Sequence, residues 1–190
     1  MRVLCLLLLL LSIGFGSAFA GPGDMAVSLY AGQLTGNKWD DFFSGEEVAS
    51  EDSYLLAATL ARRLGGYKNL LSYEIEGQVV RHFKLQEHWE FNALGVLRWE
   101  PFFWDEWLET SAAFGMGLSY ATSKPEVEIE NDGDSSQLLV YWMIELAIVP
   151  FAGRPELELL TRLHHRSTGY GLFAHKGGSN ALAVGLRYRF

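Results

Sequence analysis

The stretch 71–83, with the sequence LSYEIEGQVVRHF, alternates between two kinds of side chain. Its odd-numbered positions are mainly apolar or aromatic, and its even-numbered positions are mainly polar or acidic. A helix would mix these two sets around its axis, whereas a strand separates them onto opposite faces. The stretch therefore predicts a long β-strand with one apolar and one polar face.

The same period of two recurs along most of the chain. It is clear in the runs that follow residue 87 and less regular in two runs before residue 66. Most of the runs exceed the roughly 9–11 residues that a tilted membrane crossing needs. The eight predicted strands are 25–34, 53–65, 70–84, 87–100, 106–121, 136–148, 155–167 and 178–190.

Eight such strands favour one all-β fold. No strand edge can stay unpaired in lipid, so the strands should close into an eight-stranded antiparallel transmembrane β-barrel. The polar face combines charged and small residues, which suits a narrow lumen filled by side chains. A soluble barrel of lipocalin type, with the two faces reversed, is the alternative. The final Phe190, preceded by alternating apolar residues, resembles the C-terminal assembly signal of outer-membrane barrels.

Composition supports a membrane barrel and excludes some partners. Aromatic residues make up 14% of the 190 residues, an excess that aromatic girdles at the two membrane interfaces would explain. After the N-terminal segment, no run of 18 apolar residues is available for a membrane-spanning helix. The net charge of −8 argues against a nucleic-acid partner, which needs a basic surface.

Residues 1–20 have the pattern of a secretory signal peptide. Arg2 is followed by the leucine run 6–11, and Ala18-Phe19-Ala20 gives a small-x-small cleavage site. Cleavage would leave one domain, the barrel of residues 21–190, and would remove Cys5, the only cysteine. The mature protein would then have no disulfide, and export predicts a location in the bacterial outer membrane.

Connection lengths predict how the barrel is oriented. With both termini in the periplasm, residues 35–52, 122–135 and 168–177 would lie outside the cell, with a short connection near residue 85. The connection 122–135 is rich in acidic residues, and we expect it to be solvated. Its spacing does not match the EF-hand pattern of a calcium site.

The seventh predicted strand departs from its own pattern. Its apolar face continues into two polar residues, His165 and Ser167, which share a face because they are two positions apart. Asn180 belongs to the corresponding face of the next strand, and a hairpin would bring it near both. A serine hydroxyl becomes nucleophilic when a base can take its proton, and an amide oxygen can orient that base. The alternative is that these residues only mark the headgroup boundary.

The segment 163–167, LHHRS, together with GSNA at 178–181 and the terminal RYRF, resembles the lipid A 3-O-deacylase (PagL-type) family. The resemblance implies an eight-stranded outer-membrane barrel that acts without a cofactor. It also implies hydrolysis of the ester-linked acyl chain at the 3-position of lipid A, so lipopolysaccharide and outer-membrane lipid are the expected partners. By motif match, Ser167 would be the nucleophile and His165 the general base.

Two positions depart from that family. Asn180 stands where the best-known members have a glutamate, and Thr168 stands where they have an oxyanion-binding asparagine. Thr168 and the backbone near Gly169 and Gly171 remain the candidate oxyanion donors. The departures leave slower or absent activity open, and a non-enzymatic small barrel with a structural or loop-mediated binding role is the competing hypothesis. The sequence also leaves open whether the chain forms a homodimer.

The other histidines are interpreted as structural. His82 and His88 should face the lumen near Glu76 and Glu90, as part of a polar network rather than a metal site. His164 should also face inward, so it does not replace His165 as a base. His175 falls in a connection and should be solvated.

Overall fold

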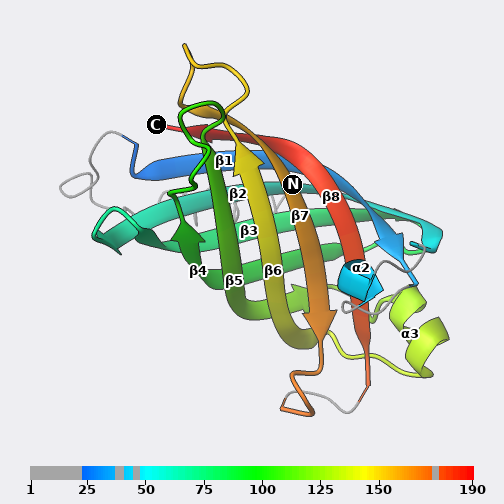
Figure 1. Cartoon of the computed structure of the whole chain (residues 1–190). Coiled ribbons are helices and arrows are strands. Elements are labelled where there is room, and N and C mark those ends of the chain that lie inside the picture. Colours follow the sequence, from blue (N-terminus) through cyan, green and yellow to red (C-terminus); the bar gives the residue numbers. More distant parts are fainter. Residues whose placement is uncertain (1–22, 37–40, 45–47, 173–175) are drawn as a thin grey trace, which may run out of the picture.

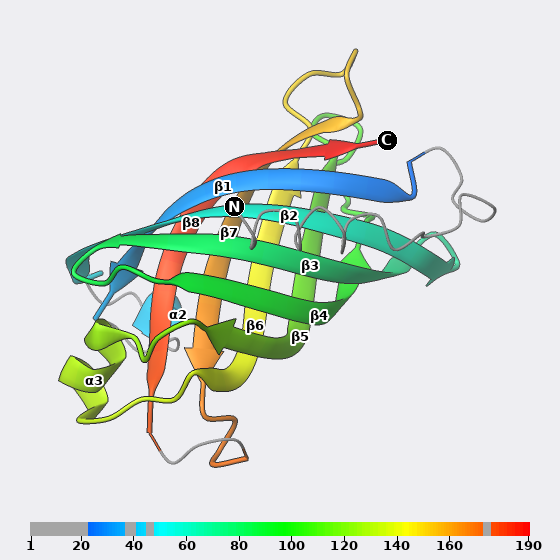
Figure 2. The same ribbon diagram turned by 180° about the vertical axis from the view of Figure 1, so that it is seen from behind.

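The computed structural model describes residues 23–36, 41–44, 48–172 and 176–190, and its strands form one closed barrel (Figures 1 and 2). Each strand pairs antiparallel with its neighbours in sequence, and β8 closes the barrel onto β1. This confirms the predicted eight-stranded fold. The strands are β1 (Met25–Thr35), β2 (Ser50–Tyr67), β3 (Leu71–Lys84), β4 (Trp89–Trp99), β5 (Thr110–Ala121), β6 (Leu138–Ile148), β7 (Leu157–Ser167) and β8 (Gly178–Arg189).

The two faces of each strand lie as the alternation predicted. Along β3, Ser72, Glu74, Glu76 and Gln78 are buried in the lumen, while the odd-numbered side chains face outward. The lumen is closed by ion pairs, including Arg98 with Glu74 and Glu145 and Arg162 with Glu76. A charged interior inside an apolar wall is the arrangement of a membrane-embedded barrel and the reverse of a lipocalin.

Aromatic side chains on the outer wall gather toward the two ends of the strands. Trp99 ends β4 and Tyr188 lies at the end of β8, whereas Phe83 and Trp89 flank the connection between β3 and β4. All four are between one third and one half exposed. Such bands suit the two interfaces of a bilayer, where aromatic rings contact both lipid and water.

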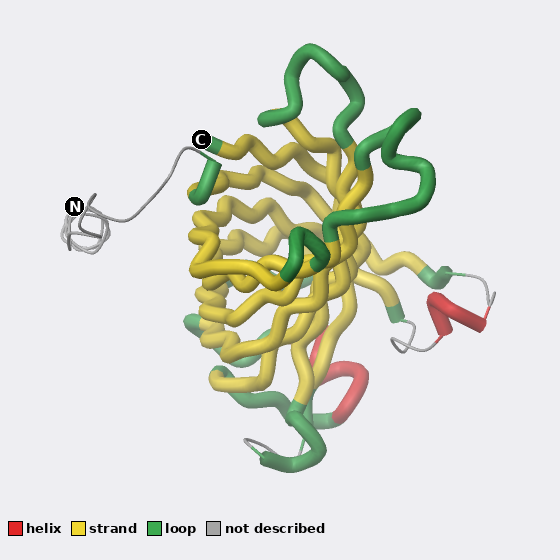
Figure 3. The backbone as a smooth tube through the Cα atoms, turned by 60° about the vertical axis from the view of Figure 1, so that its left-hand side comes forward, coloured by secondary structure: helices red, strands yellow, loops and turns green. Residues whose placement is uncertain are grey.

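The two ends of the barrel differ. The start of β1 pairs with the end of β8 at what we call the terminal end. The opposite, helical end carries α2 (Asp41–Ser44), α3 (Glu126–Asp132) and the connection between β7 and β8 (Figure 3). None of the described helices is long and apolar enough to cross a membrane. The predicted signal peptide, residues 1–20, lies outside the described residues.

Strand bounds agree with prediction to within a few residues, with the largest difference at β5. It begins at Thr110, four residues later than expected. Asp105 explains the delay, because its carboxylate accepts hydrogen bonds from the backbone N–H groups of Phe102 and Thr110 at 2.8 and 3.0 Å. These bonds hold residues 102–109 as a compact connection at the terminal end.

The prediction that residues 122–135 form a solvated connection was wrong in part. Residues 126–132 form α3, which ends at Gly133 in the left-handed conformation (φ +78°). Glu128 is fully buried and pairs with Arg166 of β7 at 3.2 Å. An acidic residue loses its hydration only when a partner compensates the charge, and Arg166 supplies that compensation.

Candidate functional site

The hairpin of β7 and β8 places the three predicted site residues on the outer wall at the helical end. His165 pairs directly with Asn180, and Ser167 pairs with Gly178. The sequence prediction of a shared outward face is therefore matched by their positions, and their chemical roles stay a prediction. Gly178 places no side chain of β8 opposite Ser167.

His165 is held on both sides although it faces outward. Its Nδ1 lies 2.6 Å from Oδ1 of Asn180. Its ring centroid lies 4.2 Å from that of Trp142, which is its register partner on β6. His165 and Asn180 are each only 7% exposed. With the amide oxygen as acceptor, Nδ1 carries the hydrogen, and the lone pair of Nε2 is available as a base.

Ser167 is half-buried, and none of the hydrogen bonds between described residues joins it to His165. The expected contact between nucleophile and base is therefore not formed in this conformation. The two residues still share one face at a separation of roughly 7 Å along the strand, which side-chain rotation can shorten. Such bonds often tighten only when substrate binds.

The turn after Ser167 contains the candidate oxyanion donors. Thr168 is half-buried, and Gly169, Tyr170 and Gly171 all have positive φ angles, between +59° and +87°. Gly169 lies close to Val140, since an added Cβ would meet that side chain at 2.5 Å. The turn is thus fixed against β6 and presents its backbone beside Ser167.

A carboxylate supports the hairpin from the lumen side. Glu128 pairs with Arg166 and accepts a hydrogen bond from Ser179 at 2.9 Å. Arg166 and Ser179 are register partners, next in sequence to the outward pair of His165 and Asn180. Burial raises the pKa of Glu128, and the charge of Arg166 opposes that rise. We call Glu128, Arg166 and Ser179 the inner clamp.

The sequence interpretation missed Trp142 and the inner clamp. Alternation along the predicted strand 136–148 can place Trp142 on the outward face, but its contact with His165 depends on the register between β6 and β7. The inner clamp joins residues 38 positions apart, and alternation alone does not show which lumen residues meet.

The remaining predicted positions are consistent with a lumen network. His164 is buried and lies 3.0 Å from Glu90 and 3.1 Å from the hydroxyl of Tyr141. His82 and His88 are also buried inside the barrel. His175 lies outside the described residues.

Fold and outer wall define the class of this protein as a small membrane β-barrel. The chain has the fold of the outer-membrane enzyme PagL, with a TM-score of 0.62 over 87% of this chain and 99% of that chain, at 12% identity. It is also similar to Neisserial surface protein A, NspA, with a TM-score of 0.54 over 90% and 99% of the two chains, again at 12% identity. No protein-family model and no curated protein sequence matches the chain.

Proposed function

We propose that this protein is an esterase of the bacterial outer membrane that hydrolyses an ester-linked acyl chain of lipid A. The hydrogen-bonded pair of His165 and Asn180 carries the proposal, because it lies on the lipid-facing wall with Ser167 on the same face. The outward positions of a membrane strand are otherwise apolar, so packing alone does not explain a hydrogen-bonded histidine at this one. PagL, an enzyme of this fold, adds support.

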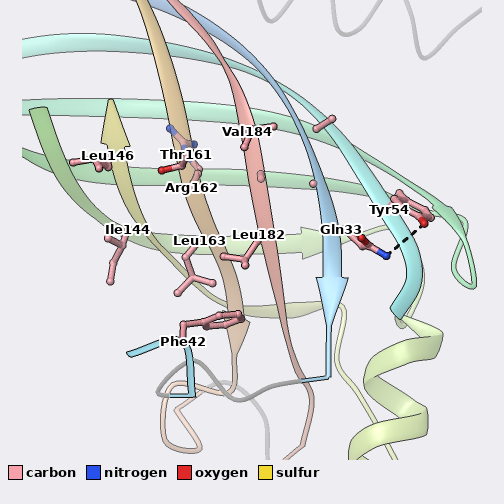
Figure 4. Close-up of a pocket in the computed structure, with 13 residues that line it drawn as sticks. Gln33, Phe42, Tyr54, Ile144, Leu146, Thr161, Arg162, Leu163, Leu182 and Val184 are labelled. Atoms are coloured by element: carbon pink, nitrogen blue, oxygen red, sulfur yellow. Dashed lines mark hydrogen bonds between the residues drawn. The ribbon is translucent and has the colours of Figure 1, made fainter. Parts of the chain in front are cut away.

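A largely apolar groove on the outer wall is lined by residues of β6, β7, β8 and β1 (Figure 4). Its volume is about 600 Å³, and Phe42 of α2 lies at its lower end in the figure, next to Leu163 and Leu182. Leu163 comes two residues before His165, and Leu182 comes two residues after Asn180, on the same faces. The groove therefore adjoins the site and suits a hydrocarbon chain. Ile144, Leu146 and Val184 complete its apolar lining.

The proposed reaction has two steps. Oγ of Ser167 attacks the ester carbonyl carbon while Nε2 of His165 takes the hydroxyl proton. The bond to the sugar oxygen breaks, His165 protonates that oxygen, and an acyl-serine forms. Water then attacks the acyl carbon with His165 as base, which releases the fatty acid and restores Ser167. Backbone amides of the 168–171 turn, with the Thr168 hydroxyl, would stabilise the negative oxygen in each step.

The test measures fatty acid released from lipid A by the detergent-purified protein, using mass spectrometry. We expect release by the wild type and at least a ~10³-fold loss in Ser167→Ala and in His165→Ala, since each removes an essential member of the pair. Ser123→Ala is the matched control, because this serine is exposed on a connection at the same end of the barrel. Heat-modifiable gel migration checks that each variant is folded.

A non-enzymatic barrel is the second candidate, favoured by the similarity to NspA and by the missing bond between Ser167 and His165. In that case His165 and Asn180 would only mark the headgroup boundary of the membrane. Folded wild-type protein that releases no fatty acid, under conditions in which a known deacylase does, would establish this alternative.

A further inference from the structure

A second cluster of polar side chains lies inside the barrel, separate from the outer-wall site. His82 near the end of β3, His88 in the following connection and Glu90 on β4 are each at most 2% exposed. One ligand atom from each lies within 4.8 Å of the other two. The rings of His82 and His88 are stacked, with centroids 4.3 Å apart.

His88 lacks the partners that a buried imidazole needs. Within the part of the chain that the structure describes, neither of its buried ring nitrogens has a hydrogen-bond partner. A neutral imidazole has one nitrogen with a lone pair, which can bind a metal ion. A buried polar group without a partner is costly, so a bound species is expected beside it.

Gln86 offers a second indication. Its Nε2 lies 3.1 Å from Nδ1 of His82, while its buried Oε1 has no partner among the described residues. Exchanging the positions of Oε1 and Nε2 in the Gln86 amide fits the same side-chain shape equally well. In that orientation Oε1 accepts from Nδ1–H of His82, and the lone pair of Nε2 then faces Oε2 of Glu90 at 2.9 Å. Two acceptors this close repel each other unless a proton or a metal cation lies between them, so this orientation suits a bound cation.

We propose that this cluster binds a divalent transition-metal ion of the Zn²⁺ type. The ligands are Nε2 of His82, one ring nitrogen of His88 and Oε2 of Glu90, with water in the fourth position. Two imidazoles and a carboxylate form a ligand set that Zn²⁺ commonly takes. Small side-chain rotations bring the three atoms to the usual metal distances of about 2.0–2.2 Å.

The surroundings of Glu90 support this assignment. Its Oε1 accepts a hydrogen bond from Asn92 at 2.8 Å and lies 3.0 Å from Nε2 of His164. These partners fix the carboxylate and leave Oε2 for the ion, as outer-shell groups do in metal sites. The field of Arg166 reaches Glu90, but the pair with Glu128 compensates that charge. The ion would tie β3 to β4 at the helical end.

The experiment uses the full chain without a histidine tag, purified in detergent and stripped with a chelator. We expect one equivalent of Zn²⁺ per chain by elemental analysis, a rise in the unfolding temperature with Zn²⁺, and tetrahedral absorption bands with Co²⁺. His82→Ala and His88→Ala should lose the equivalent, and Gln86→Ala should weaken binding about 10–100-fold. His165→Ala is the matched control, because this histidine lies on the outer wall.

Two results would overturn the proposal. One is a folded wild-type barrel that takes up no stoichiometric Zn²⁺ and gives no tetrahedral Co²⁺ bands, which needs no variant to interpret. The other is undiminished binding by folded His88→Ala, which would place the ion elsewhere. Neither outcome depends on esterase activity, so this proposal and the proposed function can fail separately.

Discussion

Asn180 supplies a neutral acceptor where a Ser-His-acid triad has a carboxylate. Its Oδ1 lies 2.6 Å from Nδ1 of His165, close enough to fix the tautomer that leaves Nε2 as a base. A carboxylate would also stabilise the imidazolium that forms during the reaction, and an amide cannot. The proposed enzyme is therefore well oriented but lacks one source of charge stabilisation.

This difference predicts an increase in activity for Asn180→Asp. The added charge should raise kcat about tenfold, since charge-assisted hydrogen bonds are roughly twice as strong as neutral ones and ~1.4 kcal/mol corresponds to a factor of ten. Asn180→Ala should lower kcat, but less than Ser167→Ala, because serine and base remain. Rates of fatty acid release from lipid A check both. An Asn180→Asp variant slower than wild type would show that the amide also serves through its donor group.

Among the elements, the β7–β8 hairpin and α3 act together. The hairpin is part of the barrel wall, which has lipid on one side and the lumen on the other, and it carries His165 and Asn180 on the lipid side. Glu128 of α3 holds Arg166 and Ser179 from the lumen side, directly behind that pair. The connection between β5 and β6, which contains α3, therefore supports the geometry of the site from the lumen side only.

Loss of this support is testable with Glu128→Gln. Removing one charge of a buried pair leaves Arg166 uncompensated and should lower the free energy of unfolding by about 3 kcal/mol. Amide hydrogen exchange of peptides that contain residues 165–167 and 178–180 should become faster, read by mass spectrometry. Asp134→Asn is the matched control, because Asp134 is exposed and pairs with Lys124 at the surface. Unchanged exchange in Glu128→Gln would mean that the hairpin is rigid without the inner clamp.

Strands were more predictable from the sequence than their connections. Alternation reports which face of a strand meets lipid, and it placed His165, Ser167 and Asn180 on one wall because consecutive strands joined by a hairpin are neighbours. It could not predict α3, because the acidic residues of 126–132 resemble a solvated segment until the position of Arg166 is known. Contacts of Trp142 and Glu128 depend on register across strands, which local pattern does not contain.

For the molecule as a whole, the interior combines buried apolar clusters with a network of charges. Arg98, Arg162 and Arg187 connect carboxylates from β3, β6 and β7 across the interior. The pairs of Arg98 with Glu145 and of Arg162 with Glu76 therefore join strands that are not sheet neighbours. Side chains fill the lumen of a narrow barrel, and paired charges satisfy one another there.

Arg162 gives the sharpest test of this network. It is 1% exposed, its Nη1 lies 2.7 Å from Glu76, and its Nε donates to Glu145 at 2.9 Å. Arg162→Met should lower the free energy of unfolding by about 3–5 kcal/mol, because two buried carboxylates lose a shared cation.

The measurement is urea unfolding in detergent, followed by heat-modifiable migration. Arg154→Met is the control, since Arg154 is exposed and pairs with Glu156 at the surface, and we expect a change below about 0.5 kcal/mol. Adding Glu76→Gln to Arg162→Met should recover part of the loss, because one uncompensated charge is removed with it. If Arg162→Met unfolded like the control, the barrel would be held by its backbone pairing and outer wall, and the charges would only fill the lumen.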